Sequence, residues 1–344
     1  MGNRSKSTMK GLALKELIAN LPKTETHLHV EGALPWEMLR EANPEKFSSV
    51  PAFRMPGFRY DSFEQFESIL IDHALLIFKS AESYYEVAKR IFEKHLAENV
   101  RYVETSFHAG MMEFLNIPGE EILQAIRAAV PEGLTVRVFL GISRNAYSPY
   151  LGPRLEQAIS EWEDLAGIDL HGLESLPLED WTMPYWEKAK ANGLTVKAHA
   201  GEFGPAGNVS HAIDQLGVRR VQHGVRAVES EDVLSRIVDS GTTLDVCPIS
   251  NYKLRVVKDW IDHPLKQFLD LGISCTISRD DPFSFDNTLC EEYLVCMDQL
   301  GCSIADVGCL ARMGFEVADM DLSEKHLAQA EISEKIDTYL ASDV

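Results

Sequence analysis

Short β-rich runs alternate with helix-like segments along most of this 344-residue chain. The runs are expected to form eight strands, at 24–30, 100–107, 135–142, 165–170, 195–199, 220–224, 242–247 and 273–278. Helical periodicity is found at 10–22, 62–98, 119–130, 151–163, 182–192, 207–217, 229–240 and 260–271. Alternation of strand and helix indicates a parallel sheet. Eight such units indicate an α/β protein with a closed (β/α)8 barrel of the TIM type.

Nothing in the sequence divides the chain into several domains. A doubly wound open sheet is the rival architecture, but no G-x-G-x-x-G motif follows the first run. No internal repeat or low-complexity linker is present. We therefore expect a single barrel domain over residues 1–344, with an irregular excursion at 35–61 over the mouth of a pocket. Two or three peripheral helices are expected at 286–344, and disorder is expected at residues 1–9.

The composition limits the classes of partner. The formal net charge of −20 argues against nucleic acid and anionic membrane surfaces, because both would repel the chain. It is compatible with a small neutral or cationic molecule. No run approaches the roughly 18 apolar residues of a membrane span, and the start lacks the apolar core of a signal peptide. The six cysteines form no C-x-x-C pair, which is typical of reduced thiols in a cytoplasmic protein.

The ends of the expected strands carry an unusual set of polar residues. In a barrel of this type the chemistry sits where the strands end. In chain order the eight runs end at His27, His29 and Glu31; at Ser106 and His108; at Ser143 and Arg144; at His171 and Gly172; at His199 and Glu202; at His223 and Gly224; at Pro248, Ser250 and Asn251; and at Asp280 and Asp281. A purely structural barrel needs none of these imidazoles and carboxylates there.

Several of these residues suit a metal ion. His27 and His29 are two apart, so in a strand they would project from the same face as a pair of ligands. Asp280 and Asp281 are adjacent carboxylates that repel each other unless a cation or a proton lies between them. Three imidazoles and a carboxylate are a ligand set that zinc accepts while keeping an open position for water. The sequence therefore predicts a catalytic metal site.

The motifs together resemble a known family. In order, the chain contains His27-Leu-His29-Val-Glu-Gly32, His199-Ala-Gly-Glu202, Gln222-His223-Gly224, Cys247-Pro-Ile-Ser-Asn251 and Ser278-Arg-Asp280-Asp281-Pro282. From about residue 20 to 335 the chain resembles the adenosine/adenine deaminase family of the amidohydrolase superfamily. The resemblance implies that one zinc ion per chain is bound by His27, His29, His199 and Asp280.

The resemblance also implies roles around the substrate. Glu202 would donate a proton to the purine ring, and His223 would orient and stabilise the attacking hydroxide. Asp281 would hydrogen-bond the ring nitrogen on the far side, and the backbone of Gly172 would contact the base. The chemistry agrees, because attack on an aromatic C–NH₂ carbon builds negative charge on the adjacent ring nitrogen. A neutral carboxylic acid there relieves that charge, so the pKa of Glu202 has to be raised by desolvation.

Three departures from the family pattern concern the substrate. Adenosine deaminases typically have Asp at the position of Glu31, where it meets the ribose hydroxyl, whereas Glu is similar to deaminases of adenine and other 6-aminopurines. His171 stands where a small residue is usual; it either contacts the substrate or fills a gap in the mouth, and we expect it to line the pocket. The sequence of residues 106–110 also differs from the usual family sequence, so the sugar side of the pocket is expected to be unusual.

The leading hypothesis is zinc-dependent hydrolytic deamination of adenosine, or of a closely related 6-aminopurine nucleoside, to the 6-oxo product and ammonia. The alternative is a deaminase of free adenine, an N6-substituted adenine or a 5′-modified adenosine. Two further classes are another hydrolase of the superfamily with Lys197 carboxylated between two metals, and a non-catalytic homologue. The remaining histidines are expected to be structural: His73, His95, His211, His263 and His326.

Overall fold

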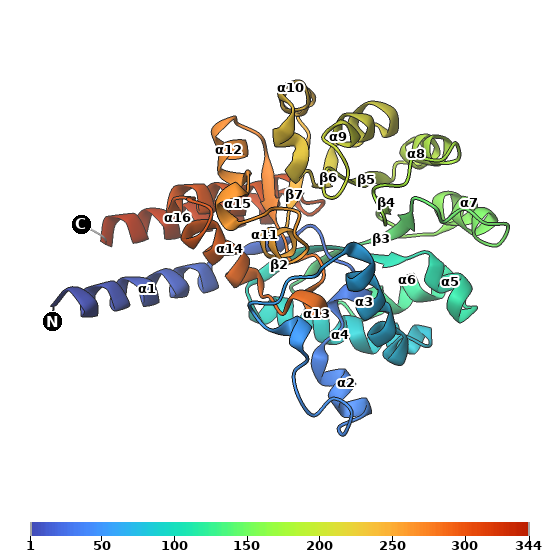
Figure 1. Ribbon diagram of the computed structural model, residues 1–344, viewed down its shortest axis with the longest axis horizontal. Coiled ribbons are helices and arrows are strands. Elements are labelled where there is room, and N and C mark those ends of the chain that lie inside the picture. The colour runs from blue at the N-terminus through green and yellow to red at the C-terminus, as the bar shows by residue number, and fades with distance from the viewer. Residues whose placement is uncertain (1, 343–344) are drawn as a thin grey trace.

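Eight parallel strands form the centre of the computed structural model, which describes residues 2–342, with side chains from residue 11 onward. They follow one another around the sheet in chain order, each hydrogen-bonded to the next (Figure 1). They are β1 (Lys23–Glu25), β2 (Val100–His108), β3 (Thr135–Ser143), β4 (Gly167–His171), β5 (Thr195–Ala200), β6 (Arg220–His223), β7 (Thr243–Val246) and β8 (Cys275–Ile277). The expected (β/α)8 barrel is confirmed.

The first and last strands meet through the residues that follow them. Leu28 and Asp280 form an isolated parallel bridge. The Asp280 N–H donates to the His27 carbonyl at 3.2 Å, and the His29 N–H donates to the Asp280 carbonyl at 3.3 Å. The ring of strands is therefore nearly closed, and the closing contacts are made by three of the predicted site residues.

The expectation of one continuous first strand over 24–30 is wrong. β1 ends at Glu25 because the next backbone N–H, that of Thr26, donates to the Ser278 hydroxyl at 2.9 Å instead of to a backbone carbonyl. His27 and His29 therefore lie beyond the regular strand, in a segment paired only by isolated bridges.

Helices surround the strands, as Figure 1 shows. They are α1 (Gly2–Asn20), α2 (Trp36–Ala42), α3 (Phe63–Ile77), α4 (Ala81–Ala97), α5 (Gly110–Leu115), α6 (Gly119–Ala128), α7 (Leu151–Glu161), α8 (Thr182–Ala191), α9 (Gly207–His211), α10 (Glu231–Ser240), α11 (Pro248–Lys253), α12 (Leu265–Asp270), α13 (Pro282–Phe285), α14 (Leu289–Asp298), α15 (Ile304–Val317) and α16 (Leu322–Ser342). The expected helix at 207–217 is divided between α9 and a π-helix, η3 (Ala212–Leu216).

Local sequence explains several helix ends. Pro282 is the first residue of α13 and therefore starts a helix directly after Asp281. Ser230 caps α10 by accepting from the Val233 N–H, and Gly241 ends the same helix in the left-handed conformation. Such signals fix where the chain turns between a strand end and the helix that returns along the outside of the barrel.

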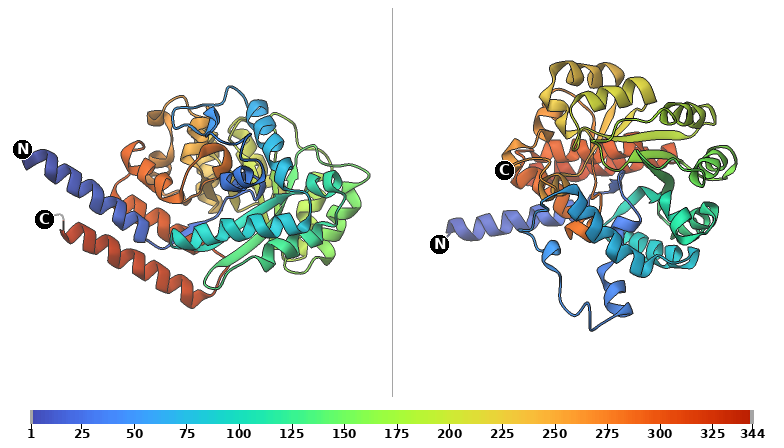
Figure 2. Two further views of the ribbon diagram at one scale, coloured as in Figure 1. Left: turned by 90° about the horizontal axis from the view of Figure 1, so that it is seen from below. Right: turned by 45° about the vertical axis from the view of Figure 1, so that its right-hand side comes forward.

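Two peripheral regions differ from, or extend, the expectation. The excursion at 35–61 is not wholly irregular, since it contains α2 and a 3₁₀ turn, η2 (Ala52–Arg54). The C-terminal tail forms the three helices α14 to α16. α1 and α16 project from the barrel on the same side (Figure 2). The disorder expected at residues 1–9 stays a prediction, and residue 1 lies outside the described part of the chain.

Within residues 2–342, no helix is both long and apolar enough to cross a membrane. All six cysteines are free, and four of them are buried.

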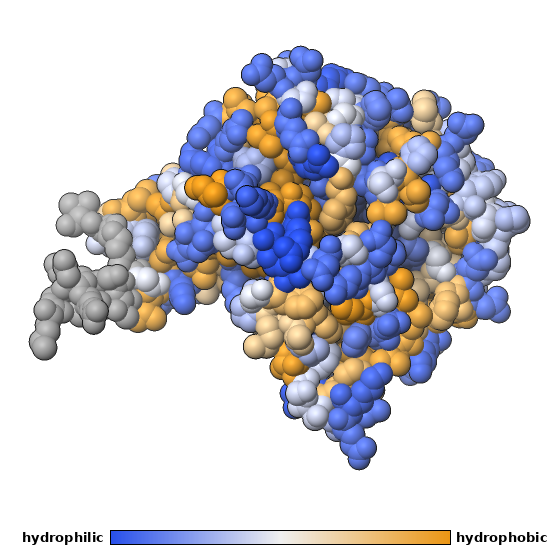
Figure 3. Space-filling view, viewed as in Figure 1, coloured by the Kyte–Doolittle hydropathy of each residue, from blue (hydrophilic) through white to orange (hydrophobic). Residues whose placement is uncertain are grey.

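On the face seen in Figure 3, hydrophobic side chains lie among hydrophilic ones, including over the position of α3. That helix covers the end of the barrel that holds the predicted site.

Candidate active site

Four predicted ligands converge at the carboxyl ends of the strands. The ligand atoms of His27, His29, His199 and Asp280 all lie within 4.8 Å of one another. His27 Nε2 is 3.0 Å from His199 Nε2. Asp280 Oδ1 is 3.3 Å from the Nε2 atoms of both His27 and His29. Residues that are 253 positions apart in sequence (27 to 280) thus share one small volume.

The far sides of two rings fix which nitrogen faces this volume. His27 Nδ1 lies 3.3 Å from the Asp245 carbonyl, and His199 Nδ1 lies 3.0 Å from the Leu170 carbonyl. A carbonyl only accepts, so both Nδ1 atoms carry the proton and both Nε2 atoms present lone pairs. Two lone pairs facing each other at 3.0 Å beside a carboxylate fit a cation between them. The residues present therefore suit a bound metal.

The other two proposed ligands also have hydrogen-bond partners outside the cluster. His29 Nδ1 is 2.9 Å from the Ser106 hydroxyl, and the Ser250 hydroxyl donates to Asp280 Oδ2 at 2.7 Å. Burial alone would lower the pKa of His29, but the Asp281 and Asp280 carboxylates outweigh it and raise that pKa to about 9. This attraction for positive charge is what a cation site requires.

The backbone is strained at two site residues. Asp280 has φ +66° and His223 has φ +65°, in the left-handed region that residues other than glycine rarely adopt. Both lie just where a strand ends and the side chain has to turn into the barrel mouth. Such strain persists only where the surroundings enforce it, and it is common at functional sites.

The turn that carries Glu202 is clamped by Glu174, a residue not predicted from the sequence. The Glu174 carboxylate is buried and accepts four backbone N–H bonds, at 2.6 to 2.9 Å, from Gly201, Glu202, Phe203 and Gly204. Gly201 has φ +69°, a left-handed conformation that glycine adopts without strain and that turns the chain there. A Cβ at position 204 would lie 2.6 Å from Glu174 Oε1, so glycine is needed for the carboxylate to approach.

Glu202 is placed to hold a proton. Its side chain is buried beside the metal-ligand cluster, and burial raises its pKa well above the usual value. The negative charges of Asp280, Glu174 and Asp281 add to this effect. A raised pKa favours the protonated carboxyl group, which is the form that can act as a proton donor.

His223 presents an N–H to the same space. Asn251 Nδ2 donates to His223 Nδ1 at 3.1 Å, which leaves the proton of the neutral ring on Nε2. Burial lowers the pKa of His223 well below its usual value, so the ring is neutral. Its Nε2 lies 3.5 Å from Glu202 Oε2 and 3.9 Å from Asp280 Oδ2. A neutral ring in this tautomer donates a hydrogen bond rather than removing a proton.

Asp281 lines the cavity, and one of its carboxyl oxygens has no hydrogen-bond partner among the described residues. That oxygen, Oδ1, is buried. Burial, together with the neighbouring Asp280 carboxylate, raises the pKa of Asp281 well above its usual value. A Cβ at Gly32 would lie 1.5 Å from Asp281 Oδ1, so any side chain there would displace the carboxyl group. Gly32 therefore makes room for Asp281.

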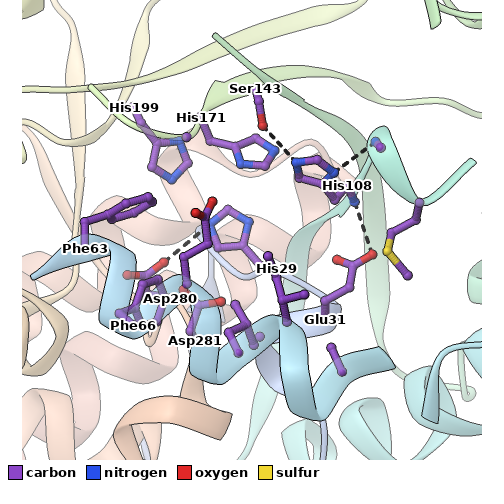
Figure 4. Close-up of a pocket in the computed structure, with 18 of the residues that line it drawn as sticks. His29, Glu31, Phe63, Phe66, His108, Ser143, His171, His199, Asp280 and Asp281 are labelled. Carbon is purple, nitrogen blue, oxygen red and sulfur yellow. Dashed lines mark hydrogen bonds and ion pairs between the residues drawn. The ribbon is translucent and has the colours of Figure 1, made fainter. Parts of the chain in front are cut away.

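These groups line a cavity of about 330 Å³, shown in Figure 4. Its polar side holds His29, Glu31, His171, Gly172, Glu202 and Asp281. Its apolar side is formed mainly by Phe63, Phe66, Leu70, Ile71, Ala74 and Leu75 of α3 and by Met111 and Phe114 of α5. Among the described residues, no lysine or arginine lines it. The size is at the lower end of the range for small-molecule pockets.

The residues that depart from the family pattern lie together in this cavity. Glu31 Oε1 accepts from the Tyr84 hydroxyl at 2.6 Å and from the His108 N–H at 3.2 Å. Burial raises the pKa of Glu31. His171 lines the cavity as expected, with its Nε2 against the wall at Gly141, where a Cβ would lie only 2.4 Å away.

His108 and Ser143 also line the cavity, although the sequence did not select them as site residues. Both were visible as strand-end residues, but neither belongs to a recognised motif. Burial, and next the charge of His29, lowers the pKa of His108 to about 4. None of the five histidines expected to be structural lines the cavity.

Lys197 lies below the site rather than in it. Its Nζ pairs with the Glu104 carboxylate, donates to the Thr26 carbonyl at 2.7 Å and is 3.6 Å from Asp245 Oδ2. The lysine is thus engaged with carboxylates inside the barrel. This arrangement argues against a carboxylated lysine that bridges two metals.

Comparison with known proteins agrees with this geometry. The sequence model described as adenosine deaminase matches residues 22–339. The chain belongs to the adenosine deaminase family. An adenine deaminase of Ralstonia nicotianae is 32% identical over 329 residues, which is 92% of this chain and 95% of the relative.

Solved structures share the adenosine deaminase fold. An amidohydrolase of Burkholderia ambifaria with bound zinc has a TM-score of 0.82 and 23% identity, and covers 96% of this chain and 94% of its own. The N6-methyl-AMP deaminase of Arabidopsis thaliana has a TM-score of 0.78 and 21% identity, covering 93% and 98%. At these identities the likeness shows the fold alone.

Proposed function

We propose that the protein is a zinc-dependent hydrolytic deaminase that converts a 6-aminopurine into the 6-oxo product and ammonia, with free adenine as the preferred substrate. The observation that carries the reaction type is the position of Glu202, a buried carboxyl group with a raised pKa, beside four convergent candidate ligands. The ligands are His27, His29, His199 and Asp280. We further propose a cytoplasmic location, with which six free cysteines agree.

A zinc ion held by these four residues would supply a Lewis acid that brings the pKa of water toward 7. Glu202 would donate its proton to the ring nitrogen next to the amino-bearing carbon, where negative charge builds during attack. The Nε2–H of His223 would orient the attacking oxygen. The free Oδ1 end of the Asp281 carboxyl would hydrogen-bond the nitrogen of the five-membered ring, and the backbone of Gly172 would contact the base.

The apolar side of the cavity would exclude water during the reaction. Phe63 and Phe66 of α3 face the polar residues across the cavity (Figure 4). A planar, neutral purine would fill the space between these two sides and displace the water. The charge that develops on the ring would then interact with Glu202 in a medium of low dielectric, where such interactions are strongest.

The leading hypothesis from the sequence was adenosine. Two observations favour free adenine instead. The curated relative at 32% identity is named adenine deaminase. Glu31, which stands at the usual position of a ribose-binding Asp, is held inside the cavity by Tyr84 and by the His108 N–H. A longer carboxyl side chain there occupies space that a ribose would need.

The absence of a lining lysine or arginine among the described residues argues against a nucleotide. A 5′-phosphate would face Glu31, Glu67 and Asp281 without a compensating cation, which costs several kcal/mol. N6-substituted adenines and 5′-modified adenosines without a phosphate are the second candidates. Intact Glu202, His223 and Asp281 argue against a non-catalytic homologue.

The experiment is a panel of 6-aminopurines followed by ammonia release: adenine, adenosine, 2′-deoxyadenosine, N6-substituted adenines, 5′-modified adenosines and N6-methyl-AMP. We expect adenine to give the highest kcat/KM. Glu202→Gln should retain about one zinc per chain and lose roughly 10²- to 10⁴-fold in kcat. The deaminase proposal would be refuted if no compound released ammonia. Normal turnover by Glu202→Gln would show that Glu202 is not the proton donor.

A further inference from the structure

A pocket of about 350 Å³ lies beside the active site and takes no part in the mechanism above. Successive side chains of a strand point to opposite faces. His171 and His199 line the active-site cavity, whereas their chain neighbours Leu170 and Ala198 line this pocket. The pocket therefore lies on the outer side of β4 and β5, behind the strands that carry the site.

Among the described residues, one permanently charged side chain lines the pocket. It belongs to Arg144, the residue directly after β3, and we call the space the Arg144 pocket. Most of the other lining residues are apolar, including Leu170, Leu176, Leu178, Ala198 and Leu216. No Asp or Glu lines it within the described part of the chain. The charge of Arg144 thus has no partner in the wall of the pocket.

The guanidinium of Arg144 is buried with most of its donors unused. Arg144 has 4% of its surface exposed. Of its five N–H donors, one is used in a side-chain hydrogen bond to a described residue, from Nη2 to the His199 carbonyl at 3.0 Å. Nε is buried and has no partner there. A buried charge without a partner is unfavourable, and buried arginines are therefore normally paired with an anion.

Glu174 does not fill this role. Its carboxylate already accepts from four backbone N–H groups of the Glu202 turn and from Asn208 Nδ2 at 2.9 Å. Burial lowers the pKa of Arg144, and the Glu174 charge offsets only part of that effect. The guanidinium therefore retains donors for an anion supplied from outside the chain.

The lining indicates the kind of anion. A guanidinium presents a planar fork that matches a carboxylate. One cation balances one negative charge, whereas a phosphate dianion would bring a second charge into a mostly apolar pocket. We propose that the Arg144 pocket is a second binding site, for a small organic monocarboxylate whose carboxylate pairs with Arg144 and whose short apolar body packs against the leucine side chains.

Such a ligand would contact two residues that support the active site. Arg144 holds the His199 carbonyl, and Asn208, which also lines the pocket, donates to Glu174. The carboxylate would thus bind behind the turn that carries Glu202. Its binding does not require turnover, so it can be measured separately from the deaminase activity.

The test is calorimetric titration of the full chain with 3-methylbutanoate, its neutral analogue 3-methylbutanamide and inorganic phosphate. Wild type should bind about one carboxylate per chain, and the amide and phosphate should bind about tenfold more weakly or not at all. Arg144→Met should weaken carboxylate binding about tenfold or more, because it removes the charge-assisted hydrogen bonds. Arg90→Met, which breaks a partly exposed pair with Glu41, is the matched control and should stay within about twofold of wild type.

Leu178 provides a second test, because Arg144 also supports the His199 carbonyl and its removal can disturb the fold. Leu178 is partly exposed in the loop between β4 and α8. Leu178→Glu places a negative charge in the wall of the pocket and should weaken carboxylate binding about threefold or more, whereas the uncharged Leu178→Gln should stay within about twofold of wild type.

Four results would each overturn the inference. They are no binding of the carboxylate by wild type, equal or tighter binding of the amide or phosphate, unchanged binding in Arg144→Met, and equal effects of the two Leu178 variants. None of these results bears on the deaminase proposal, which ammonia release tests.

Discussion

The two ends of the cavity are built differently. At one end, called the metal end, lie the four proposed metal ligands. Three of them have a hydrogen-bond partner on a strand: the Asp245 carbonyl for His27, the Leu170 carbonyl for His199 and the Ser106 hydroxyl for His29. At the substrate end much of the lining comes from α3, a helix in the long segment between β1 and β2. In a barrel, rigid strand ends can therefore hold one reaction constant while the inserted segments vary the substrate.

Removing one of the proposed metal ligands should have the largest effect on zinc content and activity. His27→Ala removes one ligand and leaves His199 Nε2 and Asp280 without their neighbour. Bound zinc should fall from about one per chain to near zero, and ammonia release should fall to the background rate. The measurements are metal analysis of the purified protein and a deaminase assay with and without added zinc.

His211→Ala is the matched control, because His211 is exposed on α9 and away from the cavity. It should keep both the metal and the activity. If His27→Ala also kept full zinc occupancy, the ligand set would have to be reassigned.

The frame beneath the metal end is a charged layer inside the barrel. Arg220 donates to Asp245 at 2.7 and 2.9 Å and to Glu104 at 3.3 Å, and Lys197 pairs with Glu104. All four side chains are buried. Two cations and two anions balance one another, so the layer is neutral only when it is complete.

Removing one cation should therefore be costly. Arg220→Met leaves Asp245 and Glu104 short of a partner, and should lower the free energy of unfolding by about 3–5 kcal/mol in a denaturant titration. Arg236→Met, which breaks an exposed pair with Asp214, is the matched control and should cost less than about 1 kcal/mol. Similar losses for the two variants would contradict the view that the inner layer supports the site.

The next prediction concerns Glu174, whose carboxylate holds the turn that carries Glu202. Glu174→Gln replaces two acceptor oxygens with one oxygen and an NH₂ group that faces backbone N–H donors. We expect the turn to shift and kcat to fall about 10²-fold, since a displacement of about 1 Å can cost that much. Zinc content should be unchanged. Glu179→Gln, exposed on the same loop, should have no effect, and a loss of zinc in Glu174→Gln would mean that the clamp serves the metal instead.

The convergence of the four proposed metal ligands was largely predictable from the sequence. The H-x-H spacing, the strand-end position of His199 and the adjacent Asp280 and Asp281 are local signals, and the barrel brings strand ends together whatever the intervening segments are. The same logic predicted all eight strands. It overextended β1, because only the folded chain shows that the Thr26 N–H is taken by the Ser278 side chain.

What the sequence did not reveal consists of contacts between different strand ends. Glu174 has no motif of its own, and its role depends on four N–H groups 27 to 30 residues later. The Asn251 contact that sets the tautomer of His223 is likewise non-local. His108 and Ser143 form a pair only because β2 and β3 are adjacent and their ends coincide.

Glu31→Asp should give the smallest effect. It tests whether the carboxylate at the substrate end determines the preference between adenine and adenosine. The shorter side chain withdraws from the Tyr84 hydroxyl and the His108 N–H and frees space on the side of the five-membered ring. The ratio of kcat/KM for adenine to that for adenosine should fall about tenfold, equivalent to roughly 1.4 kcal/mol, with zinc content unchanged. Glu37→Asp, exposed on α2, is the matched control. An unchanged ratio in Glu31→Asp would place the choice of substrate on α3 instead. In that case Phe66 and Leu70, rather than a strand-end carboxylate, would decide what enters the cavity.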